Sequence, residues 1–242
     1  MRKVMNERVK KSYAAIVCIS MLSSSFIARA DEPVRWGIGA GMNFATIALP
    51  TDRWPADSAL YQTPNKGLTI SAFMEAQISD LAYFVPQLAF VEKGTRVENI
   101  SFTAYTNGQY SYVPRGSITV DATFIELSTR FMSKLGPSWF KICPSLGPVL
   151  GLNLSSQATY EYPSRMPQDP NMRVDKNQFV APVELGLQFG LGLEISTSAR
   201  YSYLVNCGYS LGLSDFGGIY GFPSGKLSSR GAQVSVGMSF TP

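Results

Sequence analysis

The sequence predicts an all-β fold, an eight-stranded antiparallel up-and-down transmembrane β-barrel. Bulky apolar residues alternate with small or polar residues in eight separate segments, and this alternation has the period of a β-strand. Short and long connections alternate between the segments, as periplasmic turns and external loops do in outer-membrane barrels. Only 16% of the residues are charged, whereas roughly a quarter are charged in soluble domains.

The chain is predicted to begin with a cleaved signal peptide at residues 1–30, followed by the barrel domain at residues 31–242. A basic start, "MRKVMNERVKK", precedes the apolar stretch "SYAAIVCISMLSSSFI", and "ARA" at 28–30 has the A-x-A pattern of a cleavage site. This segment holds six of the 21 Lys and Arg residues and one of the 17 acidic residues. The remainder has 15 basic against 16 acidic residues, a net charge of about −1, so it offers no basic footprint for nucleic acid.

The first four strands are expected at residues 34–47, 67–77, 81–94 and 117–132. "VRWGIGAGMNFATI" places Trp, Ile, Ala, Met and Phe on one side and mainly Gly on the other. "GLTISAFMEAQ" and "LAYFVPQLAFVEKG" repeat this alternation, and the short "ISD" between them suits a tight turn. "SITVDATFIELSTRFM" follows after a long polar connection.

The last four strands are expected at residues 139–154, 182–195, 198–213 and 230–240. "WFKICPSLGPVLGLNL" follows the short connection "KLGP", and a long polar connection separates it from "PVELGLQFGLGLEI". The short connection "STS" joins the sixth strand to "SARYSYLVNCGYSLGL", and "RGAQVSVGMSF" follows another long connection. Aromatic residues near many of these ends fit the girdles that flank a barrel's lipid-facing band.

The fourth segment breaks the alternation. Its apolar residues are even-numbered from Ile118 to Phe124 and odd-numbered from Ile125 to Phe131. A β-bulge near Phe124 would restore the phase, because one extra residue shifts the following side chains to the other face.

Alternation alone leaves open which face points inward, since a soluble lipocalin-like barrel would place its apolar side inside. Two features favour an apolar outside. In residues 182–195 the second face consists of Glu, Gln and Gly, and small residues suit the narrow interior of an eight-stranded barrel. A water-facing exterior would also carry many more charges than this chain has. We therefore expect the bulky residues from Val183 to Ile195 to contact acyl chains.

Several charged residues fall on the inward face. We expect them in the lumen, where a charge must be paired or hydrated, and we interpret them as a salt-bridge network that plugs the barrel. A polar conduit or proton path is the alternative interpretation, and a catalytic site is a further one. Lys93 and Glu184 are expected nearer the outer end. The lumen network is predicted to contain Arg35, Glu75, Glu126, Arg130, Lys141, Glu194 and Arg200.

The composition argues against most catalytic chemistry. The chain has no His, which removes the usual acid-base group and the commonest ligand of zinc or haem. Beyond the signal segment the cysteines are Cys143, expected to face inward, and Cys207, expected to face outward, so a disulfide between them is not expected. We predict no cofactor, no metal site and no enzymatic activity.

Seven motifs in order give the sequence a family resemblance. "WGIGAGMNFATI", "FVPQLAFVEKG", "FIELSTRFM", "LGPVLGLNL", "LGLQFGLGLEI", "ARYSYLVNCGYSLGL" and "QVSVGMSF" span nearly all of residues 34–240. Together they resemble the PorT-type outer membrane protein beta-barrel domain group, common in Bacteroidetes and often named as porin family proteins.

The resemblance implies a location in the cell outer membrane, with the lipid bilayer and the outer-membrane insertion machinery as partners. We expect a structural or interaction barrel, or a narrow pore, whose long external loops form the recognition surface. The alternatives are a soluble lipocalin-like ligand binder in the periplasm and, from the family label alone, an accessory subunit of a secretion system.

Overall fold

A computed structural model describes residues 34–48, 61–106, 109–161, 171–175, 181–198, 200–214 and 228–242. The predicted signal peptide lies outside these residues. In the described part of the chain no helix has the length and apolarity needed to cross a membrane. The strands are β1 (Arg35–Ala48), β2 (Tyr61–Gln77), β3 (Ala82–Thr106), β4 (Gln109–Ser133), β5 (Phe140–Glu161), β6 (Asn171–Asp175), β7 (Val183–Ser196), β8 (Tyr201–Gly212) and β9 (Ser228–Phe240).

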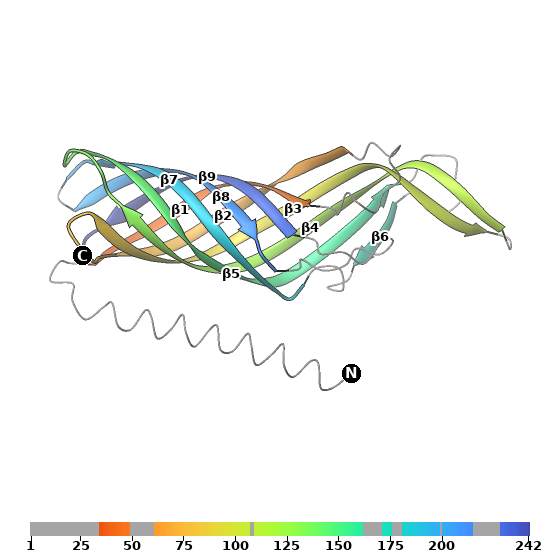
Figure 1. The fold of residues 1–242 in the computed structure, drawn as a ribbon, viewed down its shortest axis with the longest axis horizontal. Coiled ribbons are helices and arrows are strands. Elements are labelled where there is room, and N and C mark those ends of the chain that lie inside the picture. Colours follow the sequence, from red (N-terminus) through yellow and green to blue (C-terminus); the bar gives the residue numbers. More distant parts are fainter. Residues whose placement is uncertain are drawn as a thin grey trace, which may run out of the picture.

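Eight of these strands close into a barrel (Figure 1). Each pairs antiparallel with its neighbour in the order β1, β2, β3, β4, β5, β7, β8, β9, and β9 pairs back onto β1. The short β6 stands outside the ring and pairs with the outer end of β5. The predicted eight-stranded antiparallel up-and-down barrel is confirmed, because closure leaves none of the eight barrel strands as a free edge.

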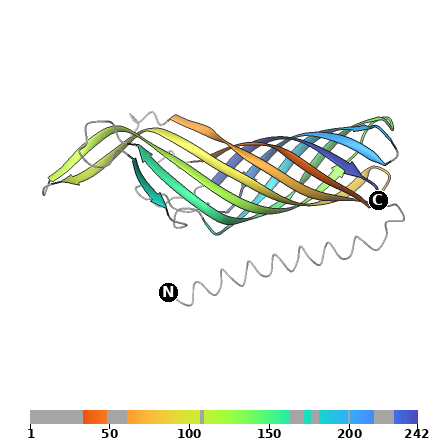
Figure 2. The ribbon, with the colours of Figure 1, turned by 180° about the vertical axis from the view of Figure 1, so that it is seen from behind.

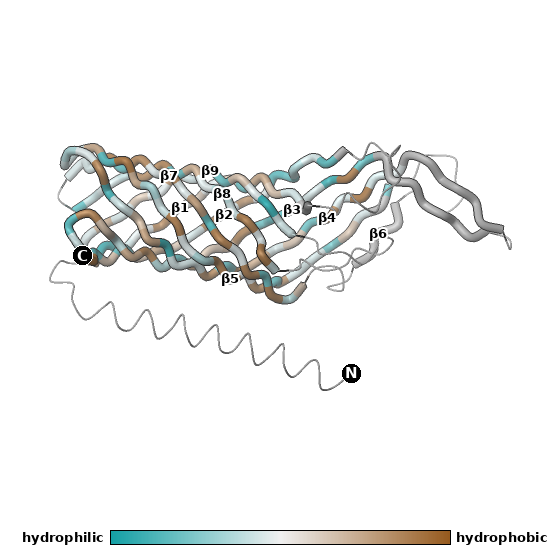
Figure 3. Tube along the Cα trace, in the orientation of Figure 1, coloured by the Kyte–Doolittle hydropathy of each residue, from teal (hydrophilic) through white to brown (hydrophobic). Residues whose placement is uncertain are grey.

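The apolar faces of the barrel strands point outward. On β7 the exposed fractions of Phe189 and Leu191 are 44% and 54%, whereas Glu184 and Glu194 are 4% and 0% exposed. Apolar residues recur along the barrel strands in this way (brown in Figure 3). The expected orientation of the segment from Val183 to Ile195 is therefore confirmed.

β3 and β4 are much longer than expected, with 25 residues each. They continue past the barrel as a hairpin that projects from the end opposite the C-terminus (Figures 1 and 2). The backbone stays paired as far as Thr106 and Gln109. The prediction of a long loop over residues 95–116 was wrong, because the strands carry on after the lipid-facing pattern stops.

The change of phase in β4 has another cause than the predicted bulge. Pairing of β4 with β3 continues without a shift from Ala82↔Ser133 to Val97↔Ile118, and the even-numbered Ile118 and Phe124 are both buried. The register shift near Phe124 lies in the pairing with β5, where Leu154 is the extra residue. The prediction of a bulge in β4 itself was therefore wrong.

The apolar residues change face because the surroundings of the barrel change. Outward positions are apolar up to Phe90 and Ile125, which pair with each other, and become polar from Glu92 and Thr123, the next outward pair. Beyond this level many of the buried side chains are apolar, including Val97, Ile118, Val120, Phe124 and Ala158, each at most 1% exposed. This is the pattern of a sheet in water, so the level of Phe90 and Ile125 marks the outer edge of the lipid-facing band.

Candidate functional site: a charged lumen

An ion-pair cluster fills the lumen at the end where β1 begins and β7 ends. Lys134 Nζ lies 2.7 Å from Glu75 Oε2 and 2.5 Å from Glu194 Oε2. Arg35 Nη1 donates to Glu194 Oε1 at 2.7 Å and lies 3.6 Å from Glu75 Oε2. The side chains of Lys134, Glu75 and Glu194 are at most 1% exposed. We call Arg35, Glu75, Lys134 and Glu194 the periplasmic cluster, because it lies at the end opposite the projecting hairpin.

The cluster satisfies charges that could not otherwise remain in such a dry site. A buried carboxylate without a partner is costly, and here each carboxylate contacts two cations. The four groups come from β1, β2, β7 and the turn after β4, which are well separated in sequence. Their pairing therefore ties opposite walls of the barrel together.

A second cluster lies nearer the outer edge of the lipid-facing band. Lys93 Nζ lies 2.7 Å from both Glu126 Oε1 and Glu184 Oε2, and 4.9 Å from the centre of the Phe124 ring. The Ser229 hydroxyl donates to Glu184 Oε1. These three charged side chains are at most 13% exposed. We call Lys93, Glu126 and Glu184 the outer cluster.

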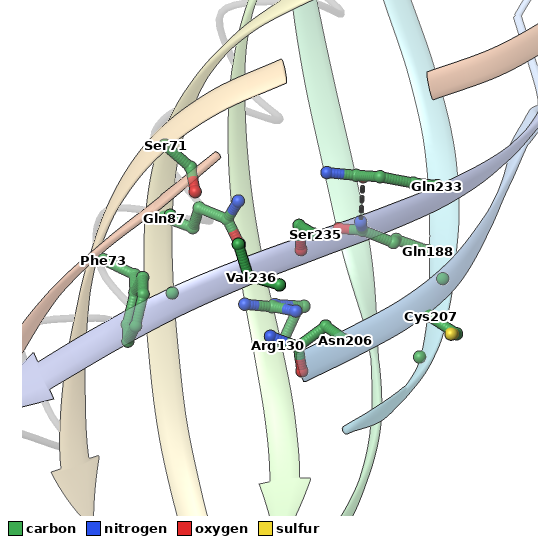
Figure 4. Close-up of a pocket in the computed structure, with 14 residues that line it drawn as sticks. Ser71, Phe73, Gln87, Arg130, Gln188, Asn206, Cys207, Gln233, Ser235 and Val236 are labelled. Carbon is green, nitrogen blue, oxygen red and sulfur yellow. Dashed lines mark hydrogen bonds between the residues drawn. The ribbon is translucent and has the colours of Figure 1, made fainter. Parts of the chain in front are cut away.

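Between the clusters, polar side chains surround a small cavity in the lumen, which we call the waist (Figure 4). Its cavity has a volume of about 20 Å³, and a cavity of roughly 10–15 Å³ already holds one water molecule. The cavity at the waist therefore has space for about one water molecule. Gln188 Nε2 on β7 donates to Gln233 Oε1 on β9 at 3.3 Å, inside the barrel across β8. Polar side chains line the waist from five strands, namely Gln87, Arg130, Gln188, Asn206, Gln233 and Ser235.

The predicted lumen residues fall into separate places. Arg35, Glu75 and Glu194 meet in the periplasmic cluster, and Glu126 belongs to the outer one. Arg130 lines the waist. Lys141 lines the open mouth of the barrel at the end where the periplasmic cluster lies. Arg200 is exposed in the turn that precedes β8, where it joins neither cluster.

Sequence reasoning missed the role of Lys134. This residue follows β4 in the short segment "KLGP", which was interpreted only as a turn. The available signal was parity: Lys134 continues the even-numbered inward positions of β4 beyond Met132, and Met132 is buried. Lys93 and Glu184 were placed near the outer end, but their contact with each other required knowledge of the barrel's curvature.

The arrangement favours holding strands together over reaction chemistry. The buried cations of both clusters contact carboxylates at 2.5–2.7 Å, so they form structural ion pairs. No group of three or more acidic or Cys side chains suited to a metal ion occurs in the described ranges. Of the two described cysteines, Cys143 is buried and Cys207 is exposed, and both are free.

The sequence matches a known protein family. Residues 23–217 match the family described as outer membrane protein beta-barrel domain. The chain belongs to this family. Membership of the family locates the protein in the outer membrane, with its barrel embedded in the lipid bilayer. Together with the apolar exterior, it decides against the soluble lipocalin-like alternative.

Several solved structures of outer-membrane barrels resemble this member of the family. The attachment invasion locus protein Ail of Yersinia pestis is 9% identical, with 86% of this chain and 100% of that chain covered and a TM-score of 0.38. OprG from Pseudomonas aeruginosa is 11% identical, with 87% and 97% covered and a TM-score of 0.41. The outer membrane protease OmpT from Escherichia coli is 6% identical, with 87% and 97% covered and a TM-score of 0.43. No functionally curated protein matches the sequence significantly.

Proposed function

We propose that this protein is a closed, non-enzymatic interaction barrel of the PorT type, exported with residues 1–30 as a cleaved signal peptide and placed in the outer membrane by the insertion machinery. The observation that carries the proposal is the filled lumen: a waist with a cavity of about 20 Å³ lies between two buried ion-pair clusters. An eight-stranded barrel of this kind is held together by its interior and leaves no path for solutes.

Conductance across a planar lipid bilayer tests closure. Refolded protein should give no discrete openings. A porin with an open channel, reconstituted in the same way, should conduct, which shows that the assay detects an open lumen. Discrete openings from the unaltered protein would favour the narrow-pore alternative.

The outward surface of the barrel's extension is the proposed recognition surface. β3 and β4 project beyond the lipid-facing band (Figure 1), and loops and hairpins on a rigid scaffold are where binding residues gather. The extension is rigidified from within by buried apolar residues, including Val97 and Ile118. Its outer face carries ion pairs of Arg96 with Glu98 and Glu161 at 3.0 and 2.9 Å.

A gene deletion with complementation tests this surface. The chain can be shortened by joining Val97 to Ile118, which are paired in register, through an Asn-Gly turn. Deletion of the gene is expected to alter the composition of proteins at the cell surface. The shortened protein should insert normally into the membrane but should not return that composition to normal. Full restoration would show that recognition does not use the projecting hairpin. Yield of exported proteins in the same strains tests the secretion-accessory alternative.

A further inference from the structure

The periplasmic mouth of the barrel contains an open cavity of about 500 Å³. The periplasmic cluster forms its floor through Arg35, Glu75 and Glu194, and Lys141 and Trp139 stand on its wall. We call this cavity the vestibule. Its volume lies within the roughly 300–1,000 Å³ of small-molecule binding sites, whereas the waist above it has space for one water molecule.

Positive charge is in excess around the vestibule. Arg35 and Lys141 line the vestibule and Lys134 lies in the cluster at its floor, against the two carboxylates Glu75 and Glu194, which leaves one positive charge over. Both oxygens of Glu194 already contact a cation, at 2.7 Å from Arg35 and 2.5 Å from Lys134. Lys141 takes part in none of the ion pairs found among the described residues.

Hydrogen-bonding groups complete the lining. Arg35 Nη2 donates to the Ser202 hydroxyl at 2.5 Å, and the hydroxyls of Ser202 and Ser196 lie 3.0 Å apart. Glu75 lines the cavity and is only 2% exposed, and its Oε1 atom is buried without a hydrogen-bond partner. Hydroxyls of the lining come from Ser138, Ser196, Thr197, Ser198, Ser202 and Thr241.

We propose that the vestibule binds the oxyanion group of a periplasmic molecule, a phosphate or a carboxylate, at Lys141 and the adjoining hydroxyls. The excess of cations selects a negative group, and charge-assisted hydrogen bonds to Lys and hydroxyl donors are the usual means of holding one. This site faces the periplasm, so it is independent of the recognition surface proposed above.

Binding is measured on the refolded full barrel in lipid nanodiscs through the fluorescence of Trp139, which lines the vestibule. Two probes separate the sources of the oxyanion: inorganic phosphate, and acetyl-alanyl-alanine beside its C-terminal amide. Saturable binding of phosphate alone, or of the free acid but not the amide, supports the site and identifies its chemistry. Binding of the amide as tightly as the acid, or saturable binding of neither oxyanion, overturns it.

Two variants test the residues, with one matched control. Lys141→Met removes a charge-assisted contact, so the dissociation constant should rise at least about tenfold. Ser198→Asp, in the exposed turn after β7, adds a negative charge to the lining, keeps an oxygen acceptor for the N–H of Tyr201 and should abolish binding. Arg200→Gln removes a positive charge at the same end but outside the lining, and should bind as the unaltered protein does. Unchanged affinity in Lys141→Met or Ser198→Asp would refute the assignment.

Discussion

Replacing Lys93 by Met should destabilise the barrel strongly, although the change is nearly isosteric. Lys93 Nζ lies 2.7 Å from an oxygen of Glu126 and 2.7 Å from one of Glu184. Those two oxygens are therefore no more than 5.4 Å apart. Without the ammonium group, two carboxylates repel each other in a dry site.

The magnitude follows from these distances. At an effective dielectric constant of about 20, two unit charges 5.4 Å apart repel by about 3 kcal/mol. Removing one partner of a buried ion pair costs about 3–5 kcal/mol in other proteins. We therefore expect Lys93→Met to lower the free energy of unfolding by about 3–5 kcal/mol, measured by urea titration of the barrel in lipid vesicles.

Two comparisons identify the cause of the loss. The triple variant Lys93→Met, Glu126→Gln, Glu184→Gln removes the unpaired charges and should recover most of the stability. Arg96→Met breaks ion pairs whose side chains are 42–47% exposed, so it should cost less than about 1 kcal/mol. If Lys93→Met and Arg96→Met lower stability equally, or if the triple variant gives no recovery, the argument from buried charge is wrong.

Three further substitutions have expected outcomes. Leu191→Arg places a charge on the lipid-facing side near the middle of β7 and should oppose folding into vesicles by about 2–4 kcal/mol. Its control is Glu92→Arg, on the outward face beyond the lipid-facing band; equal folding of the two variants would contradict the assignment of Leu191 to the lipid-facing side. Phe124→Ala empties a fully buried position and should cost about 3–5 kcal/mol in urea unfolding; unchanged stability would contradict tight packing at this position. Gly37→Val places a side chain where the Phe73 ring lies and should cost about 1–3 kcal/mol by overpacking; unchanged thermal stability would show that Phe73 moves freely.

The barrel was predictable because lipid outside and a narrow lumen inside demand strict alternation over many strands. On β7, the opposed exposures of Leu191 and Glu194 follow directly from their odd and even positions. The alternating lengths of the connections supplied the up-and-down order. Both signals are local, so they require no knowledge of which strands meet across the barrel.

The extension was not predictable with the same rule, because that rule assumes one environment along each strand. Ile118 and Leu127 are both apolar, yet the first is buried and the second is 43% exposed. The strand passes from lipid to water between them, which exchanges the preferred faces without any slip in register. The sequence signal for this boundary has two parts. The apolar residues change from even-numbered to odd-numbered positions, and a charged residue such as Asp121 stands at an outward position on the water side.

The ion-pair partners were only partly predictable. Parity assigns Glu75 and Glu194 to the lumen, but whether a charge lies in a cluster or at a rim depends on its height in the closed barrel. Arg200 and Lys134 both stand beside short turns, yet Arg200 is exposed and Lys134 is 4% exposed. Only the geometry of closure separates these two cations.

Spin-label accessibility at Cys207 tests the orientation of the barrel most directly. Cys207 is exposed on the outward face of β8, so it needs only replacement of the other cysteines by Ser. A nitroxide on Cys207 of the reconstituted barrel should be relaxed strongly by oxygen, which concentrates in lipid, and weakly by a water-soluble nickel chelate. A label at Glu92→Cys should give the reverse order. High nickel and low oxygen accessibility at Cys207 would show that this face meets water and would contradict the membrane-embedded barrel.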